Sequence, residues 1–280
     1  MTCARSISQI REQVAAARRE GRIIGLVPTM GALHAGHAAL IDRARREAGF
    51  VVVSIFVNPI QFDRAEDYQA YTINLEADLE FCAARGVDAV FAPSPAEMYP
   101  SAIAASVEVA ALSESLCGKF RPGHFRGVAT VVAKLFHIVA PDRAYFGEKD
   151  AQQLAIIERM VADLNFPIDI VAVPTVREPD GLALSSRNRR LTAEERAAAP
   201  ILYQALERGL QRLSQGSRCA AEVREAALET LAREPRARVE YLEVVDARTM
   251  SPIEEITGPV RIAAAVWFGA TRLIDNVAGP

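Results

Sequence analysis

The chain has little cysteine, and its few thiols are far apart. It contains 280 residues but only four cysteines, which are Cys3, Cys82, Cys117 and Cys219. They show no paired spacing of the kind that marks a disulfide framework or a zinc site. We therefore expect reduced thiols in a cytoplasmic protein, and no metal site formed by the chain's own side chains.

An excess of basic charge and long hydrophobic runs are also absent. The chain has 35 acidic and 32 basic residues, and its net charge of −3 argues against a general nucleic-acid-binding surface. No apolar run is long enough to cross a bilayer. Near the N-terminus, charges stand at Arg5, Arg11 and Glu12 where a secretory signal would have an apolar core. We expect neither nucleic acid nor a membrane as a partner.

Hydrophobic residues make up half of the chain, which is enough for a substantial core. In the first 175 residues, short apolar runs alternate with segments of helical periodicity. We predict strands at residues 23–27, 50–57, 107–110, 143–146 and 168–173, a turn with a short strand within residues 86–92, and helices at residues 7–20, 38–47, 74–85, 128–139 and 153–164. This order predicts an α/β fold with a Rossmann-like, doubly wound parallel sheet.

The pattern changes beyond residue 175. Helices dominate residues 193–233, and short strands are predicted at residues 239–245, 260–267 and 273–277. We expect the boundary near residues 175–190. The expected division is a Rossmann-like domain at residues 1–175 and a smaller α+β domain at residues 176–280 that covers a cleft.

A turn rich in glycine and histidine joins the first predicted buried strand to a helix. Gly31 and Gly36 let the backbone come close to a ligand, and His34 and His37 stand three residues apart at the helix start. Helix N-termini bind anions, so the turn predicts a phosphate site. The alternative is that both histidines are ordinary core or surface residues.

Three other segments carry polar side chains near predicted strand ends. Lys149 begins a helix, where a cation is disfavoured unless an anion binds. Gln61 follows a strand and can serve hydroxyls and carboxylates. Ser185, Ser186 and Arg187 can hold phosphate oxygens. The alternatives are an exposed lysine, an ordinary loop glutamine and an interdomain linker.

The segment at residues 117–127 reads as a basic, glycine-rich loop. Closure of this loop over an anionic ligand and a plain solvated connection are equally compatible with its sequence. We interpret His137, within the predicted helix at residues 128–139, as structural.

Several motifs, taken in order, resemble the pantothenate synthetase family, whose members are pantoate–β-alanine ligases. Besides the turn at residues 27–37, the motifs are Asn-Pro-x-Gln-Phe at residues 58–62, Arg-Pro-Gly-His-Phe at 121–125, Phe-Gly-x-Lys-Asp at 146–150, Ser-Ser-Arg-Asn at 185–188 and the segment at 271–276. The His-x-Gly-His motif at residues 34–37 alone marks a broader nucleotidyltransferase superfamily. The combination is far more specific.

This resemblance implies a two-step reaction assisted by Mg²⁺. ATP and pantoate would first form pantoyl adenylate and release pyrophosphate. The amine of β-alanine would then attack the activated carbonyl, giving pantothenate and AMP. The resemblance also implies a homodimer formed through the larger domain.

The resemblance also implies roles for individual residues. His37 would be the proton donor, with His34, Lys149 and Arg187 as the other catalytic residues. Gln61 and Gln153 would bind pantoate, and Gln61 would also serve β-alanine. The implied ATP-binding residues are Met30, Gly31, Ala32, Leu33, His34, Ala35, Gly36, His37, Gly147, Glu148, Lys149, Asp150, Val176, Leu184, Ser185, Ser186 and Arg187.

The chain departs from the family pattern at three places. Thr72 and Ile73 stand where the family usually has Pro-Arg, so no role of that arginine carries over. His137 replaces a common asparagine, and Cys117 replaces a common glutamate. None of these positions lies in the nucleotide motifs.

Three other functions remain as alternatives. A transferase of the same superfamily that adenylylates a phosphate ester would need a second basic pocket in place of the two glutamines. A regulatory nucleotide-binding module would have no need for Lys149, Arg187 and both histidines together. A tRNA-charging enzyme would need an anticodon-binding domain and a basic excess.

Overall fold

The computed structural model describes residues 1–63, 68, 69, 71 and 74–280. Its larger part contains a six-stranded sheet in the order β1-β4-β3-β2-β5-β6, with all neighbours parallel. The strands are β1 (Thr2–Ala4), β2 (Ile24–Thr29), β3 (Phe50–Ile55), β4 (Ala89–Phe91), β5 (Arg143–Gly147) and β6 (Asp169–Val173). The Rossmann-like, doubly wound prediction is confirmed. The short edge strand β1 adds to it, because three residues are too few to show a period.

The strand order explains where a ligand site forms. From β2 the chain adds β3 and β4 on one side and later returns to add β5 and β6 on the other. The order therefore reverses between β2 and β5. In open parallel sheets a crevice forms outside the carboxyl ends of the strands at this switch point.

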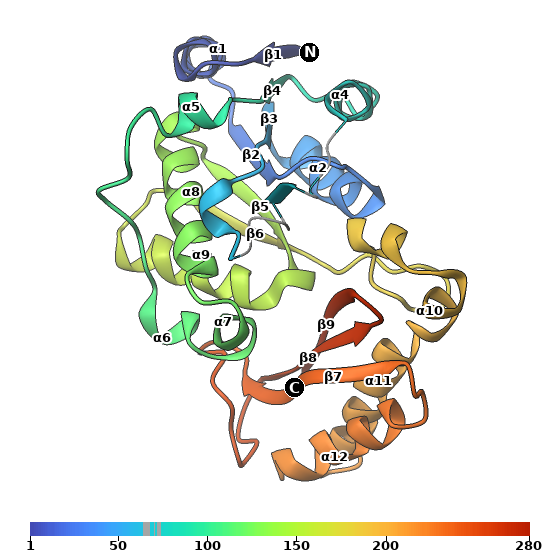
Figure 1. Cartoon of the computed structure of the whole chain (residues 1–280). Coiled ribbons are helices and arrows are strands. Elements are labelled where there is room, and N and C mark those ends of the chain that lie inside the picture. Colours follow the sequence, from blue (N-terminus) through green and yellow to red (C-terminus); the bar gives the residue numbers. More distant parts are fainter. Residues whose placement is uncertain (64–67, 70, 72–73) are drawn as a thin grey trace.

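Helices cover both faces of this sheet (Figure 1). On one face lie α1 (Ile7–Arg19), α8 (His124–Val139) and α9 (Ala151–Asp163), and on the other lie α2 (Ala35–Glu47) and α4 (Leu75–Ala83). Val52 packs in the first layer, whereas Val51 and Val53 pack in the second. Successive side chains of a strand alternate between faces, so burial on both sides accounts for the continuous apolar runs of the strands.

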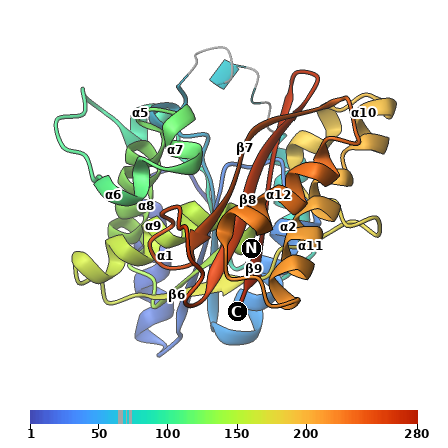
Figure 2. The same cartoon turned by 90° about the horizontal axis from the view of Figure 1, so that it is seen from below.

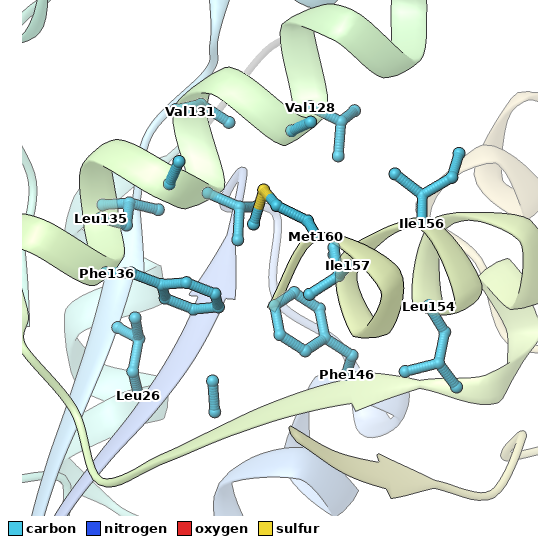
Figure 3. Close-up of a cluster of buried hydrophobic side chains, with 14 of the residues drawn as sticks. Leu26, Val128, Val131, Leu135, Phe136, Phe146, Leu154, Ile156, Ile157 and Met160 are labelled. Atoms are coloured by element: carbon cyan, nitrogen blue, oxygen red, sulfur yellow. The ribbon is translucent and has the colours of Figure 1, made fainter. Parts of the chain in front are cut away.

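The larger core joins α8 and α9 to the sheet (Figure 3). The rings of Phe136 from α8 and Phe146 from β5 meet edge to face, with their centroids 6.5 Å apart, beside Ile157 and Met160 from α9. Burying each such side chain contributes about 1.5–3 kcal/mol to the stability of the fold, relative to leaving it exposed. This packing fixes α9, whose N-terminus lies at the cleft.

The C-terminal part is built from helices and a second, smaller sheet. Its elements are α10 (Ala193–Ala198), α11 (Ile201–Ser214), α12 (Ala220–Leu231), β7 (Ala237–Asp246), β8 (Val260–Phe268) and β9 (Thr271–Gly279). The three strands are antiparallel, in the order β7-β8-β9, as expected for an α+β unit.

The small sheet packs on both of its faces (Figure 2). One face meets α11 and α12 around Leu206, Val223 and Ile262. The other face joins the larger core through Ala263 and Tyr241. Most buried residues up to β6 belong to the cores around the parallel sheet, and most of those after β6 belong to the core of the C-terminal part. We therefore propose a domain division into residues 1–175 and 176–280.

Two local predictions are wrong. Residues 107–110 are not a strand: the backbone N–H of Val107 donates to Thr130 Oγ1 (3.0 Å), and helix α6 (Ala110–Ser113) begins at the last of these residues. Residues 117–127 are not one continuous loop, because α7 (Leu116–Phe120) and the first turn of α8 occupy most of them. Short helices of about one turn show no readable period, which accounts for the second error.

His137 is exposed on α8, and the centroid of its ring lies 5.2 Å from that of the Phe166 ring. Thr72 and Ile73 lie outside the described residues. Among the residues that the structure does describe, no helix is both long and apolar enough to span a bilayer.

Candidate functional site

A cleft of about 260 Å³ opens at the carboxyl ends of β2, β3 and β5. It gathers most of the predicted site residues from five separate segments of the chain. Those that line it are Met30, His34, Gly36, His37, Gln61, Gly147, Lys149, Asp150, Gln153, Val176, Leu184, Ser185, Ser186 and Arg187. The predicted residues Gly31, Ala32, Leu33, Ala35 and Glu148 lie in the adjoining turns and are not part of this lining.

The turn after β2 has a tightly fixed backbone. Gly31 and Ala32 both adopt the left-handed conformation, with φ of 81° and 53°. The carboxylate of Asp78 on α4 accepts hydrogen bonds from the N–H groups of Ala32 (2.9 Å) and Leu33 (2.8 Å). Asp78 is buried. Sequence reasoning missed this residue, because an acidic side chain in the first turn of a helix is common on dipole grounds alone.

The two histidines cap helix α2 with their side chains. His34 is the N-cap, and its Nδ1 accepts a hydrogen bond from the N–H of Gly36 (3.1 Å). His37 returns the contact, because its Nδ1 accepts from the N–H of His34 (3.2 Å). The ring centroids are 4.1 Å apart. The predicted common face of the pair is therefore confirmed.

This capping determines the tautomers of both rings. When Nδ1 accepts a hydrogen bond, a neutral imidazole carries its proton on Nε2. Burial, with help from the charge of Lys149, lowers the pKa of His34 to about 4. Burial and the neighbouring His34 lower the pKa of His37 to about 3. Both rings are thus neutral near pH 7, and each keeps one Nε2–H donor.

Gly36 is required by this arrangement. A Cβ at this position would lie 2.8 Å from Cε1 of His34 and 3.0 Å from its Nδ1. Such contacts are closer than real Cβ atoms make, so a larger residue would displace the capping ring. The glycine serves the close approach of a side chain to the helix start.

Lys149 lies in a second strand-to-helix turn, as predicted. It belongs to the 3₁₀ turn η2 (Glu148–Asp150), which connects β5 to α9. Its side chain is 16% exposed, and its Nζ lies 3.9 Å from the carboxylate of Asp150. A largely buried cation thus stands beside a helix N-terminus, where the helix dipole disfavours it and nearby negative charge, such as that of Asp150, favours it.

Gln61 is oriented by a directed chain of hydrogen bonds. The hydroxyl of Tyr99 donates to Oδ1 of Asn58 (2.7 Å), and Nδ2 of Asn58 donates to Oε1 of Gln61 (3.0 Å). The amide nitrogen of Gln61 is left to face Sδ of Met30 (3.1 Å), a weak acceptor in the cleft wall. Gln61 therefore presents its donor side to the cleft.

His124 and Arg121 also line the cleft, although sequence reasoning assigned them no role. Nη1 of Arg121 lies 3.1 Å from Nε2 of His124, and Nδ1 of His124 lies 2.8 Å from the carbonyl of Gln61. A guanidinium can only donate, so Nδ1 carries the proton and donates to Gln61. Burial, followed by the charge of Arg121, lowers the pKa of His124 to about 4. Arg121 follows the end of α7 and His124 begins α8, so neither stands at a strand end and their place in the chain carried no comparable signal.

The loop with Ser185 and Arg187 closes the cleft from the side of the C-terminal part. The hydroxyl of Ser185 accepts from the backbone N–H of Arg187 (3.2 Å), at the start of the 3₁₀ turn η3 (Ser186–Arg190). Upstream, Arg177 forms a bidentate ion pair with Asp275 of β9 (2.6 and 3.0 Å). The loop is thus tied to the small sheet and is not a free linker.

No group of three or more His, Cys, Asp or Glu side chains that could hold a metal ion occurs among the described residues. Cys117, one of the departures, contacts the hydroxyl of Tyr241 through its Sγ (3.1 Å) and lies outside this cleft lining.

Comparison with known proteins gives consistent matches along the chain. The family model described as pantoate-beta-alanine ligase matches residues 2–278. Pantothenate synthetase of Moorella thermoacetica is 55% identical over 277 residues, which cover 99% of this chain and 98% of that protein. The enzyme of Heliobacterium modesticaldum is 52% identical over 276 residues, covering 98% of each.

Solved structures agree with these relatives. A crystal structure of pantothenate synthetase from Thermus thermophilus has a TM-score of 0.93 and 49% identity, covering 99% of both chains. A pantoate-beta-alanine ligase from Francisella tularensis, complexed with beta-gamma ATP and beta-alanine, has a TM-score of 0.82 and 36% identity, covering 99% of this chain and 97% of that one. On this sequence and structural similarity, the chain belongs to the pantoate-beta-alanine ligase (pantothenate synthetase) family and is a ligase.

Proposed function

We propose that this chain condenses pantoate with β-alanine at the expense of ATP, through pantoyl adenylate. The pantoate carboxylate attacks the α-phosphorus of ATP, and pyrophosphate leaves. The β-alanine amine then attacks the acyl carbon, and AMP leaves with the carboxylate oxygen that it received. One observation supports the proposal above all. A single cleft contains the turn with His34 and His37, the turn with Lys149, each at the start of a helix, and the oriented side chain of Gln61.

The triphosphate is assigned to the donors of both turns. Nε2–H groups of His34 and His37 stand at the N-terminus of α2, and Lys149 stands at the start of α9. Ser185 and Arg187 add donors from the opposite side. Such preorganised donors neutralise the charge that develops when a carboxylate approaches a phosphate.

The neutral state of the histidines suits this role. A neutral Nε2–H donates without a counter-ion, so the free cleft does not have to hold buried charge. A bound triphosphate raises the pKa of a nearby imidazole, because an opposite charge favours the protonated form. His37 can then act as the proton donor that the family resemblance implies.

Pantoate is assigned to Gln61 and Gln153. The amide nitrogen of Gln61 faces the cleft, so it can donate to a carboxylate or hydroxyl oxygen. Gln153 lines the same cleft from α9, one turn after Lys149. Two neutral amides orient a carboxylate without the strong ground-state stabilisation of a salt bridge, which would weaken it as a nucleophile.

Mg²⁺ is assigned to the ATP-bound state. Mg²⁺ is usually held by substrate phosphates together with one or two carboxylates, and Asp150 is a carboxylate in the cleft lining. Its chemistry there is to neutralise phosphate charge. We also propose a homodimer formed through the larger domain, which the mass in solution would test.

Product release tests the reaction. ATP and Mg²⁺ are mixed with pantoate alone, and pyrophosphate and AMP are measured before and after β-alanine is added. We expect pyrophosphate without free AMP in the first mixture, and AMP after the addition. Absence of pantoate-dependent release would withdraw the substrate, and a phosphate ester that supports release in its place would favour the rival transferase.

A further inference from the structure

Asn276 lies in the last strand, β9, yet its side chain reaches the turn that carries Lys149. Its Nδ2 donates to the backbone carbonyls of Glu148 (2.9 Å) and Lys149 (3.0 Å). The residue is 5% exposed. The turn η2 has no side-chain cap of its own, so an amide from the C-terminal part holds the peptide groups on both sides of the Lys149 Cα.

A second contact fixes the orientation of this amide. Oδ1 of Asn276 accepts from Nη1 of Arg261 (2.6 Å), and Nη2 of Arg261 pairs with the carboxylate of Glu148 (3.4 Å). Because a guanidinium can only donate, the atom that faces Arg261 is the amide oxygen. The NH₂ group must therefore point at the two carbonyls. Both functional groups of the side chain are used.

Asp275, the residue before Asn276, ties β9 to the segment that leads to Ser185 and Arg187. Asp275 accepts two hydrogen bonds from Arg177, which also donates to the backbone carbonyls of Gly181 (3.1 Å) and Asn276 (3.3 Å). Arg177 forms an isolated bridge with Ala183, just before the loop that carries Ser185 and Arg187. Asp275 and Asn276, which are adjacent in β9, thus contact the segment that leads to Arg187 and the turn that carries Lys149.

We propose that Asn276 is a positioning residue for adenylate formation, acting through the backbone of Lys149. The proposal rests on the proposed function. A cation at a helix start is disfavoured by the helix dipole, and Nζ of Lys149 lies 3.9 Å from the half-exposed carboxylate of Asp150, so a restraint on the backbone of the turn helps to keep Lys149 in place. Small displacements of a positioned group cost rate steeply. The C-terminal part therefore completes the nucleotide site and does more than cover it.

A double-mutant cycle tests this coupling. Asn276→Asp keeps the shape and the contact with Arg261 but places an oxygen against two carbonyls. We expect pantoate-dependent pyrophosphate release in single turnover to fall at least tenfold, with the pantoate KM changed less than threefold. In a Lys149→Ala background the same substitution should change the rate less than twofold, because the positioned group is already gone.

Controls separate the possible failures. Asn165→Asp makes the same chemical change at an exposed position beyond the other end of α9, and it should leave the rate near that of the wild type. If the wild-type chain shows no pantoate-dependent release, the proposed function fails. If the wild type is active and Asn276→Asp matches it, or loses the same factor in both backgrounds, the positioning role is overturned.

A second variant covers the case in which Asn276→Asp does not fold. Arg261→Gln leaves Asn276 in place but removes the charged anchor of its oxygen. We expect a smaller loss, about threefold to tenfold, with the same dependence on Lys149. An unchanged rate, or an equal loss in the Lys149→Ala background, would overturn the proposal.

Discussion

In the candidate site, each histidine of the pair at the start of α2 uses one ring nitrogen to cap the helix, and we propose that the other serves a ligand. Nδ1 of His34 and of His37 accept backbone N–H groups, so Nε2–H is the free donor of each ring. The sequence predicted this pair from its spacing, because residues three apart at a helix start share a face. It could not predict the contacts of Asp78 with the Leu33 backbone or of His124 with the Gln61 backbone, because these partners lie 45 and 63 residues away in the chain.

His37→Ala and Lys149→Ala should each slow adenylate formation about a hundredfold or more, the scale of losing one transition-state donor. Single-turnover pyrophosphate release measures this loss. His137→Ala is the matched control, because this histidine is exposed and outside the cleft lining. Near-normal release in either cleft variant would remove that residue from the proposed mechanism.

Gln61→Glu should raise the pantoate KM tenfold or more and leave the ATP KM almost unchanged. The change replaces the donor that faces the cleft with a carboxylate, which repels the substrate carboxylate. Unpaired or repelled polar groups in such sites cost about 1–3 kcal/mol, which corresponds to roughly fivefold to a hundredfold or more in KM. Steady-state kinetics with each substrate varied in turn would decide it, and an equal rise in both KM values would argue for a general distortion.

At the scale of elements, the site depends on two strand-to-helix turns that the strand order brings together. β2 and β5 are neighbours, so the turns that follow them open onto the same cleft. Long periodic elements were predictable from sequence, since their apolar faces repeat. The one-turn helices α6 and α7 were not, because elements of four or five residues carry no period.

Gly36→Ala should disturb the start of α2 more than an ordinary glycine substitution. The added Cβ would collide with the His34 ring, so we expect at least a tenfold loss in adenylate formation and about 1 kcal/mol in stability, the scale of a lost N-cap. Gly258→Ala provides the comparison, because a Cβ there meets nothing within 4 Å. Equal behaviour of the two variants in rate and melting temperature would refute the capping account.

At the scale of the whole molecule, the cleft is completed by contacts between distant parts of the chain. Arg177 pairs with Asp275, and the amide of Asn276 reaches the turn of Lys149. The sequence indicated two parts and a boundary near residues 175–190. It could not indicate these ties, because no periodicity relates residues that are so far apart in the chain.

The buried, neutral histidines also predict how stability depends on pH. Their folded-state pKa values, about 4 for His34, 3 for His37 and 4 for His124, lie below the unfolded value of 6.5. The unfolded chain therefore binds more protons below pH 6.5, and stability is lost as the pH falls from there toward 4. One such histidine accounts for about 2 kcal/mol between about pH 7 and pH 5.

Denaturant unfolding of the wild type and of His124→Asn at about pH 7 and pH 5 measures this pH dependence of the free energy of unfolding. The difference between the two chains isolates the histidine, because the carboxylates that also titrate in this range are shared. We expect the variant to lose less stability on acidification, by about 2 kcal/mol. Identical pH dependence would show that His124 is not held neutral by the fold.

We propose that pantoate is activated as an adenylate in this cleft. Pantoate labelled with ¹⁸O in its carboxyl group tests it most directly, with the products of a complete reaction analysed by mass spectrometry. We expect one ¹⁸O atom in AMP and the other in the amide carbonyl of pantothenate. Label in inorganic phosphate with ADP as the co-product, or no label in AMP, would contradict it.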